Sequence, residues 1–190
     1  MKLYFVTTNE HKVEEVAHVL QPYGIQVKQV HRELAEPDVG SQEKVALYKA
    51  EQAFALVKKP VIVEDTGVYF NAYRDFPGIF AKRIYNGIGL RGLLKLLKGV
   101  DRRAMFKVVI VLQWGKTARQ RKVFVGTLSG KMAHGVHKPS ARRLAYEKLF
   151  IPDGYSKTIV EMSLSEKNKF SHRAIAAHKL ARWLKRHGLR

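Results

Sequence analysis

The sequence contains no cysteine, and its apolar stretches are short. The absence of cysteine excludes disulfides, thiolate metal sites and cysteine nucleophiles, and it fits a reducing compartment such as the cytoplasm. The apolar stretch Met1–Val6 has the length of a first strand and is too short for a signal peptide or a membrane span, so we expect no membrane association. The sequence also has no internal repeat, no low-complexity run and no linker, which favours a single domain over residues 1–190.

Acidic residues are scarce relative to basic ones. The chain has 35 Lys and Arg against 16 Asp and Glu, a formal net charge of +19. Such a field attracts polyanions, whether nucleic acids, anionic membranes or free nucleotides. A basic surface tuned for solubility explains the same composition, and charge alone does not choose between these partners.

The order of periodic segments predicts an α/β fold. Hydrophobic residues make up 46% of the chain, which is enough for a substantial core. Strands and helices are expected to alternate in a β-α-β-α-β order over the first third of the chain. A hairpin and a C-terminal helix follow, so we expect two lobes that share a sheet and enclose one cleft. The expected segments are Leu3–Thr7, a helix capped by Asn9, Ile25–Val30, Gln42–Lys58, Val61–Val63, Ala104–Trp114, Arg121–Ser129 and Ser171–His187.

Two adjacent carboxylates, Glu64 and Asp65, follow the apolar residues Val61–Val63. We expect them at the C-terminal end of a short buried strand, before a turn at Gly67. In open α/β sheets ligands bind in the crevice beyond these strand ends. Carboxylates placed there can hold a divalent metal or orient a water molecule. The alternative is a solvated pair before a turn.

The segment Thr7–Lys12 follows the first strand and opens the first helix. Backbone N–H groups and the helix dipole favour an anion at such a position, and Lys12 adds a point charge suited to phosphate. The segment lacks the Gly-x-x-x-x-Gly-Lys frame of a Walker loop. The alternative is a plain Asn9 cap beside a solvated lysine.

Glu36 lies in the polar loop after the second expected strand. Together with Asp65 it offers a carboxylate from each of two segments, a common way to hold Mg²⁺ that also binds substrate phosphates. The neighbouring Glu33 and Asp38 are more typical of solvated side chains. Lys49 lies in the middle of the second helix, where it either reaches into the cleft or remains exposed.

The segment Glu166–Arg173 opens the last helix. Ser171 is suited to cap it, while His172 and Arg173 lie in the first turn, where cations oppose the helix dipole. Cationic side chains at a helix start indicate a partner that is anionic or that presents the polar edge of a nucleotide base. The alternative is a solvated basic helix start.

Taken in order, these motifs resemble those of the inosine triphosphate pyrophosphatase family, also called the noncanonical purine NTP pyrophosphatase or Ham1-like family. Each motif is weak alone, but six in the right order over nearly the whole chain are specific. They are Thr7-Thr-Asn-Glu-His-Lys12, the loop carboxylate Glu36, Glu64-Asp-Thr-Gly67 with the later turn Pro77-Gly78, Gly126-Thr-Leu-Ser-Gly130, Phe150-Ile-Pro-Asp-Gly154, and Glu166-Lys-Asn-Lys-Phe-Ser-His-Arg173.

The resemblance implies a two-lobed fold with a long mixed central β-sheet flanked by helices and a cleft between the lobes. It implies Mg²⁺-dependent hydrolysis of ITP, dITP or XTP to the monophosphate and pyrophosphate by a cytoplasmic homodimer. Asp65 and Lys49 would be catalytic, and Glu36 and Asp65 would hold the metal. The implied substrate-binding residues are Thr7, Asn9, Lys12, Lys82, Tyr146, Glu147, Lys167, His172 and Arg173.

One segment departs from the family. Members usually carry Phe-Gly-Tyr/Trp-Asp-Pro in the purine pocket, where this chain has Leu144-Ala-Tyr-Glu-Lys148, after a basic loop over residues 138–143. The stacking aromatic, the glycine and the proline are lost, so we expect weaker base discrimination. A weakened family member that binds nucleic acid through its basic surface is the alternative function.

Overall fold

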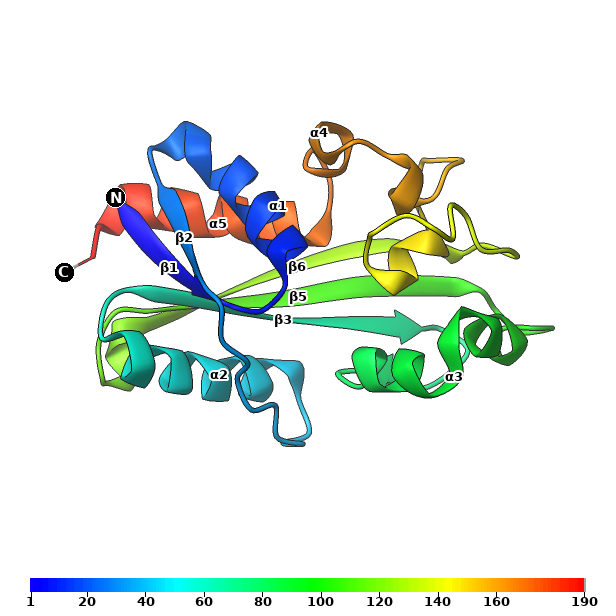
Figure 1. The fold of residues 1–190 in the computed structure, drawn as a ribbon, viewed down its shortest axis with the longest axis horizontal. Helices are drawn as coiled ribbons and strands as arrows, with labels where there is room; N and C mark the ends of the chain where they lie inside the picture. Colours follow the sequence, from blue (N-terminus) through cyan, green and yellow to red (C-terminus); the bar gives the residue numbers. More distant parts are fainter. Residues whose placement is uncertain (190) are drawn as a thin grey trace.

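The protein is described by a computed structural model that covers residues 1–189, and it contains a mixed seven-stranded sheet flanked by helices (Figure 1). This arrangement confirms the predicted α/β class with a long mixed central sheet. The strands are β1 (Lys2–Val6), β2 (Gln26–Val30), β3 (Val61–Phe70), β4 (Pro77–Gly78), β5 (Arg103–Gln113), β6 (Arg121–Met132) and β7 (Phe150–Pro152).

Five α-helices connect or cover these strands. They are α1 (Glu10–Leu20), α2 (Gln42–Val57), α3 (Ala81–Leu96), α4 (Leu164–Lys167) and α5 (His172–His187). Short 3₁₀ turns occur at Gln21–Tyr23, Ala118–Gln120, Ala145–Lys148 and Ile159–Glu161. No helix within residues 1–189 combines the length and the apolar character that crossing a membrane requires.

The strand order in the sheet is β2-β1-β3-β5-β6-β7, with β4 paired to β3. The crossovers through α1 and α2 make β1 parallel to β2 and β3. The hairpin between β5 and β6 and the long return from β3 make the remaining pairs antiparallel. Figure 1 shows that β3, β5 and β6 run most of the length of the molecule and thereby join its two ends.

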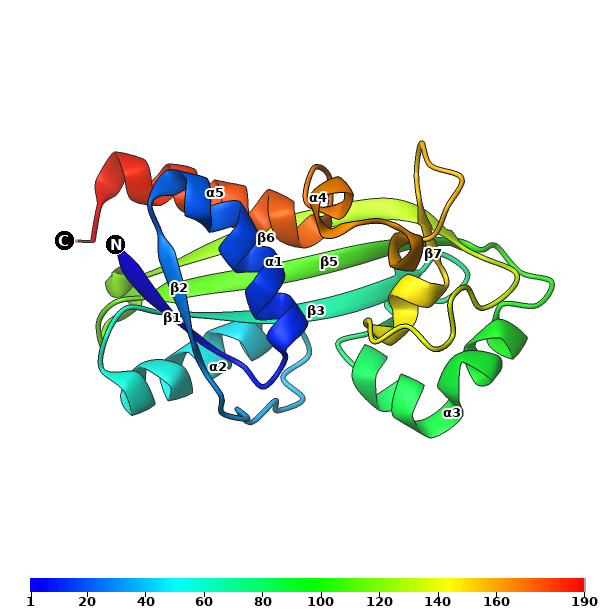
Figure 2. The same ribbon diagram turned by 45° about the horizontal axis from the view of Figure 1, so that its top comes forward.

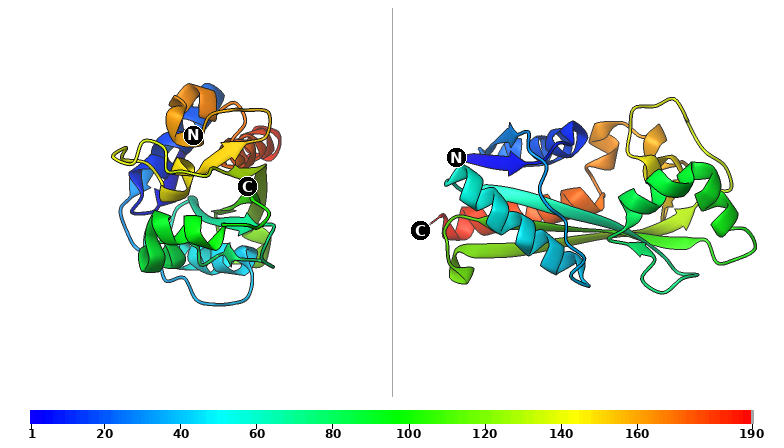
Figure 3. Two further views of the ribbon diagram at one scale, coloured as in Figure 1. Left: turned by 90° about the vertical axis from the view of Figure 1, so that its right-hand side faces the viewer. Right: turned by 60° about the horizontal axis from the view of Figure 1, so that its bottom comes forward.

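Alternating residues of the central strands divide the core between two layers of helices. Ile62 and Ile110 belong to the core formed with α1 and α5, whereas Val63 and Val109 pack with α2. Figure 2 shows α1 and α5 over one face of the sheet, and the right-hand view in Figure 3 shows α2 over the other. At the far end a third core joins α3 to Phe70, Phe106 and Phe150.

The strand that carries the paired carboxylates is longer than predicted. It continues through Glu64 and Asp65 to Phe70, because β5 pairs with it in one antiparallel register throughout. Gly67 therefore lies inside a strand, where a Cβ would approach Tyr69 Cε2 to 2.9 Å and a β4 carbonyl oxygen to 3.0 Å. The prediction that the two carboxylates end a strand before a turn was wrong. They nevertheless lie just beyond the end of the neighbouring parallel strand β1.

Helix α3 consists of two helical halves, which meet at Gly89 with a φ of 62°. Only glycine adopts this conformation without a steric cost. The first half of α3 faces the carboxylates across a cavity.

Candidate active site

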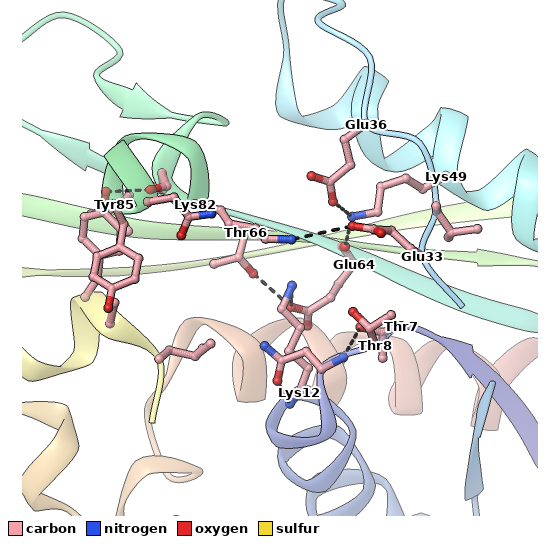
Figure 4. Close-up of a pocket in the computed structure, with 18 of the residues that line it drawn as sticks. Thr7, Thr8, Lys12, Glu33, Glu36, Lys49, Glu64, Thr66, Lys82 and Tyr85 are labelled. Atoms are coloured by element: carbon pink, nitrogen blue, oxygen red, sulfur yellow. Dashed lines mark hydrogen bonds and ion pairs between the residues drawn. The ribbon is translucent and has the colours of Figure 1, made fainter. Parts of the chain in front are cut away.

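A cavity of about 810 Å³ opens beside β3, between the elements at the two ends of the sheet. One side is formed by the start of α1, the loop over residues 32–36 and Lys49 of α2. The other side is formed by the first turns of α3 and residues 143–146. Figure 4 shows Glu36 and Lys49 at one end of this space and Lys82 and Tyr85 at the other, with Thr66 between them.

The first side of the cavity is built on the N-terminus of α1. Asn9 caps the helix by accepting a hydrogen bond from the Lys12 backbone N–H at 3.3 Å, and Thr7 Oγ1 accepts from the Asn9 N–H at 3.2 Å. The Lys12 ammonium lies 3.0 Å from Glu64 Oε1. The turn after β1 thus brings Thr7, Asn9 and Lys12 to the cavity together, and the alternative of a fully solvated lysine does not apply.

Lys49 connects the predicted metal carboxylates. Its Nζ lies 2.6 Å from Glu36 Oε1 and 3.4 Å from Asp65 Oδ1, and it also donates to the Glu64 carbonyl oxygen at 2.9 Å. Lys49 and Asp65 are buried, whereas half of the Glu36 side chain is exposed. The structure therefore excludes the alternative of an exposed helix lysine, and it brings Glu36 and Asp65 to the same ammonium group.

The two carboxylates differ in how readily they lose a proton. Burial raises the pKa of Asp65, and the nearby Lys49 and Lys12 only partly offset it. For Glu36, burial also opposes ionisation, but Lys49 outweighs it and lowers the pKa. The pKa of Lys49 is raised, because Asp65 and Glu36 outweigh the effect of its burial. Glu36 thus remains a carboxylate, while Asp65 accepts a proton more readily than an exposed aspartate does.

The donor set fits a metal that is shared with a ligand. Within residues 1–189 no three His, Cys, Asp or Glu side chains are close enough to form a metal cage. Asp65 Oδ2 is buried and has no hydrogen-bond partner in this part of the chain. Mg²⁺ is commonly held by one or two carboxylates plus substrate phosphates. Glu36 and Asp65 match that pattern and do not match a site built from protein alone.

Behind this side of the cavity lies a buried network of charged groups. Lys167 Nζ lies 2.6 Å from Glu15 Oε1 and 2.5 Å from Glu147 Oε1. Arg173 lies 2.7 Å from Glu15 Oε2 and makes two bonds to Glu64, at 2.7 and 2.9 Å. The network links α1, β3, residue 147, α4 and α5 in one cluster with all five side chains buried.

The signature at the start of α5 is therefore placed one layer behind the cavity. Ser171 caps the helix as predicted, accepting from the Ala174 N–H at 3.1 Å. Arg173 meets carboxylates of the chain itself, which explains how a cation is tolerated in the first helical turn. His172 is buried and stacks on Phe106, with ring centroids 4.8 Å apart. Burial lowers the pKa of His172 well below its usual value, so the ring is neutral.

The other end of the cavity is more apolar. Tyr146 lines it and is buried, with its hydroxyl donating to the Ala81 carbonyl oxygen at 2.8 Å. The departing residues Leu144 and Ala145 lie in the same wall. The predicted phosphate ligand Lys82 also lines the cavity and is mostly exposed, with its ammonium 3.9 Å from Glu33.

The predicted residues thus fall into two groups. Those that line the cavity are Thr7, Asn9, Lys12, Glu36, Lys49, Lys82 and Tyr146. Those that form its supporting layer are Asp65, Glu147, Lys167, His172 and Arg173. Asp65 contacts Lys49, which lines the cavity, and the substrate or metal contacts assigned to all five residues remain predictions.

The model of the Ham1 family matches residues 3–183 of this chain. The chain belongs to the Ham1 family. This result confirms the family resemblance that the ordered motifs predicted.

Named relatives match nearly the whole chain. A protein of Hyperthermus butylicus named dITP/XTP pyrophosphatase is 44% identical over 98% of this chain and 96% of its own length. A protein of Methanothermobacter marburgensis with the same name is 37% identical over 96% of each chain. Among solved structures, a HAM1 protein from Coxiella burnetii superposes with a TM-score of 0.84 at 22% identity, covering 98% of this chain and 99% of that one. The last similarity concerns the fold alone.

Sequence reasoning missed several residues of this Ham1 site, including Glu15, Thr66 and Tyr85. Glu15 holds both Lys167 and Arg173, Thr66 donates to Glu64 Oε1 at 3.0 Å, and Tyr85 lines the cavity. A signal existed for Glu15, because it lies one helical turn after Lys12 and therefore on the same side of α1. Tyr85 carried no signal, since its position depends on how α3 packs across the cavity.

Proposed function

We propose that this protein hydrolyses noncanonical purine nucleoside triphosphates, such as ITP, dITP and XTP, to the monophosphate and pyrophosphate. The observation that carries this proposal is the cavity itself. Its one side gathers lysines and carboxylates suited to a triphosphate and a metal, and its other end is apolar enough for a base. The names of the curated relatives, dITP/XTP pyrophosphatase, support the same substrate class.

The triphosphate would lie against the N-terminus of α1. Backbone N–H groups there favour an anion, and Lys12 reaches the same space. Lys49 and Lys82 would bind the remaining phosphate oxygens from the opposite directions. All three ammonium groups already face carboxylates. The phosphate oxygens would therefore replace these carboxylates as partners of the lysines.

Glu36 and Asp65 would hold Mg²⁺ together with the phosphates. Bound Mg²⁺ supplies neutralisation of negative charge on the phosphate oxygens. Asp65 would also orient the attacking water and accept its proton, a role for which a carboxylate with a raised pKa is suited. The new P–O bond forms as the α–β phosphoanhydride bond breaks, and pyrophosphate leaves. Lys12 and Lys49 would stabilise the charge that develops on the phosphoryl oxygens.

The base would occupy the apolar end of the cavity. Tyr146 would contact it directly, and Glu147, Lys167, His172 and Arg173 would set the shape and charge of its pocket from the supporting layer. A 6-keto purine presents an acceptor where adenine presents a donor, so an N–H of Lys167 or Arg173 that is not taken up by a carboxylate would favour inosine and xanthosine.

We further propose that the whole chain acts as one two-lobed pyrophosphatase domain and that it is a cytoplasmic homodimer. The lack of cysteine supports a reducing compartment. Size-exclusion chromatography with light scattering tests the dimer, because a homodimer would have twice the 21.7 kDa chain mass.

The proposed activity is tested with a panel of ITP, dITP, XTP, ATP and GTP, each with and without Mg²⁺. We expect pyrophosphate release that requires Mg²⁺ and is faster for the first three substrates. The Asp38→Asn variant should match the native protein. Asp38 is an exposed carboxylate of the loop that carries Glu36, but it does not line the cavity. Equal turnover of all five nucleotides would contradict the substrate class, and no pyrophosphate release would contradict the activity.

A further inference from the structure

Three aromatic side chains line the cavity: Tyr85, Phe106 and Tyr146. Two of them, Phe106 and Tyr146, are buried and already contact other side chains or backbone of the protein. Phe106 is 3% exposed, and His172 stacks parallel to its ring, at an interplanar angle of 6°. Tyr146 is 6% exposed and its hydroxyl is bonded to Ala81. Neither ring offers a large free face to a ligand.

Tyr85 differs from the other two. It is only half-buried, and its hydroxyl makes no hydrogen bond to the part of the chain that the structure describes. Its ring lies against the Tyr146 ring at a tilt of 58°, with centroids 6.5 Å apart, which fixes its place without covering both faces. Figure 4 shows Tyr85 at the end of the cavity away from Glu36 and Lys49.

The packing of α3 explains why Tyr85 points into the cavity. Ala81, Lys82, Tyr85 and Asn86 all line it, and they recur at the spacing of one helical face. The same face therefore presents a cation and, one turn later, an aromatic ring. The wall around Leu144 and Ala145 contributes no ring of its own, since neither residue is aromatic.

We propose that Tyr85 is the residue on which the purine base stacks in this chain. This inference rests on the proposed function. Tyr85 supplies a π surface to a cavity whose 144–145 wall provides none. Stacking is tolerant of base identity, because every base has a π face. Tyr85 therefore provides affinity for the base, while discrimination between bases comes from other groups.

The experiment compares Tyr85→Leu with Tyr85→Phe, which keeps the ring. We would measure binding of IMP and of inorganic tripolyphosphate by calorimetry, and kcat and KM for ITP. Tyr48→Leu is the matched control, because Tyr48 is 45% exposed on α2 and does not line the cavity. Circular dichroism would confirm that the variants are folded.

We expect Tyr85→Leu to weaken IMP binding and to raise KM for ITP by about ten- to a hundredfold, the usual scale of one stacking contact. Tripolyphosphate binding should not change, kcat should change by less than about threefold, and Tyr85→Phe should resemble the native protein. Adding Leu144→Phe to Tyr85→Leu should restore most of the IMP affinity, because it returns an aromatic ring to the same end of the cavity.

Unchanged IMP binding in Tyr85→Leu, in a native protein that hydrolyses ITP, would overturn this inference and leave the proposed function intact. Equal losses of IMP and tripolyphosphate binding would also overturn it, since they would indicate a structural role. If the native protein neither binds IMP nor hydrolyses ITP, the proposed function fails together with the inference.

Discussion

At the scale of single residues, the two lysines nearest the paired carboxylates have acidic partners before any ligand binds. Lys12 faces Glu64, and Lys49 faces Glu36 and Asp65. A buried charge without a partner would be costly, so these pairs keep the side chains ionised and oriented. An incoming metal and triphosphate can then exchange partners with them.

Asp65→Asn should lower kcat by at least about a hundredfold, because the amide cannot accept a proton from water. Glu36→Gln should reduce the rate and also raise the Mg²⁺ concentration needed for half-maximal activity. Initial rates of pyrophosphate release over a Mg²⁺ titration measure both effects, with Asp38→Asn as the control. Turnover of Asp65→Asn close to the native value would remove that residue from the chemistry.

The sequence predicted that Lys12, Lys82 and Glu36 lie near one another, and the structure places all three at the cavity, but the sequence could not show the layer behind them. Local motifs and strand patterns suffice for Lys12 and Glu36, since each follows a recognisable strand, whereas they left open whether Lys49 of α2 reaches the cavity. Glu15, in contrast, pairs with side chains 152 and 158 positions later. No local pattern reports a contact of that separation, so Lys167 and Arg173 were assigned to the substrate alone.

Glu15 should make the free energy of unfolding depend on pH in the acidic range. Burial opposes its ionisation, but Arg173 and Lys167 outweigh burial and lower its pKa from 4.5 to about 2. A lowered pKa in the folded state stabilises the protein above about pH 4.5, and this contribution is lost as the pH falls toward 2. Glu15→Gln should therefore cost about 3–5 kcal/mol of unfolding free energy near neutral pH.

Urea unfolding at pH 7, 4.5 and 2.5 measures this difference. The difference in free energy of unfolding between the native protein and Glu15→Gln should be largest at pH 7, slightly smaller at pH 4.5 and much smaller at pH 2.5. Glu14→Gln is the control, because the neighbouring Glu14 side chain is 57% exposed. A difference in free energy of unfolding that does not vary with pH would contradict the assignment of the low pKa to Glu15.

At the scale of elements, the long strands position the site. The antiparallel pairing of β3 with β5 carries Glu64 and Asp65 along a straight strand, and β6 supports α5 behind them. Sequence patterns identified α1, α2, α5 and the β5–β6 hairpin, because these have clear periodicity. They missed the length of β3, since its second half lies on the far core and its small and polar residues mimic a turn.

The close packing of α5 on β6 depends on Gly126. A Cβ at this position would lie 2.0 Å from the His172 carbonyl oxygen and 2.9 Å from the Ala176 nitrogen. Gly126→Ala should therefore displace the start of α5 and destabilise the fold by about 1–3 kcal/mol. Gly87→Ala is the control, since a Cβ there meets no atom within 4 Å and should be neutral or stabilising. Thermal unfolding of both variants tests this, and equal stability would contradict tight helix packing at Gly126.

At the scale of the whole molecule, the chain has a net charge of +19 and a cavity that is suited to a small polyanion. The field should steer nucleotides toward the cavity and should also attract nucleic acids without specificity. Polymer binding of this kind falls steeply with salt, because each phosphate contact releases counterions.

Labelled duplex DNA and single-stranded RNA should therefore bind at low salt and dissociate at physiological salt. Fluorescence anisotropy at both ionic strengths measures this. Submicromolar binding at physiological salt, combined with no hydrolysis of nucleotides, would support the nucleic-acid-binding alternative and would reject the enzyme.

The identity of the products formed from ITP tests the central claim most directly. Phosphorus NMR of a reaction with Mg²⁺ distinguishes cleavage between the α- and β-phosphates from cleavage at the γ-phosphate. We predict IMP and pyrophosphate in equal amounts as the first products, with no IDP. Formation of IDP and orthophosphate, or no turnover of ITP while ATP is consumed, would contradict the account.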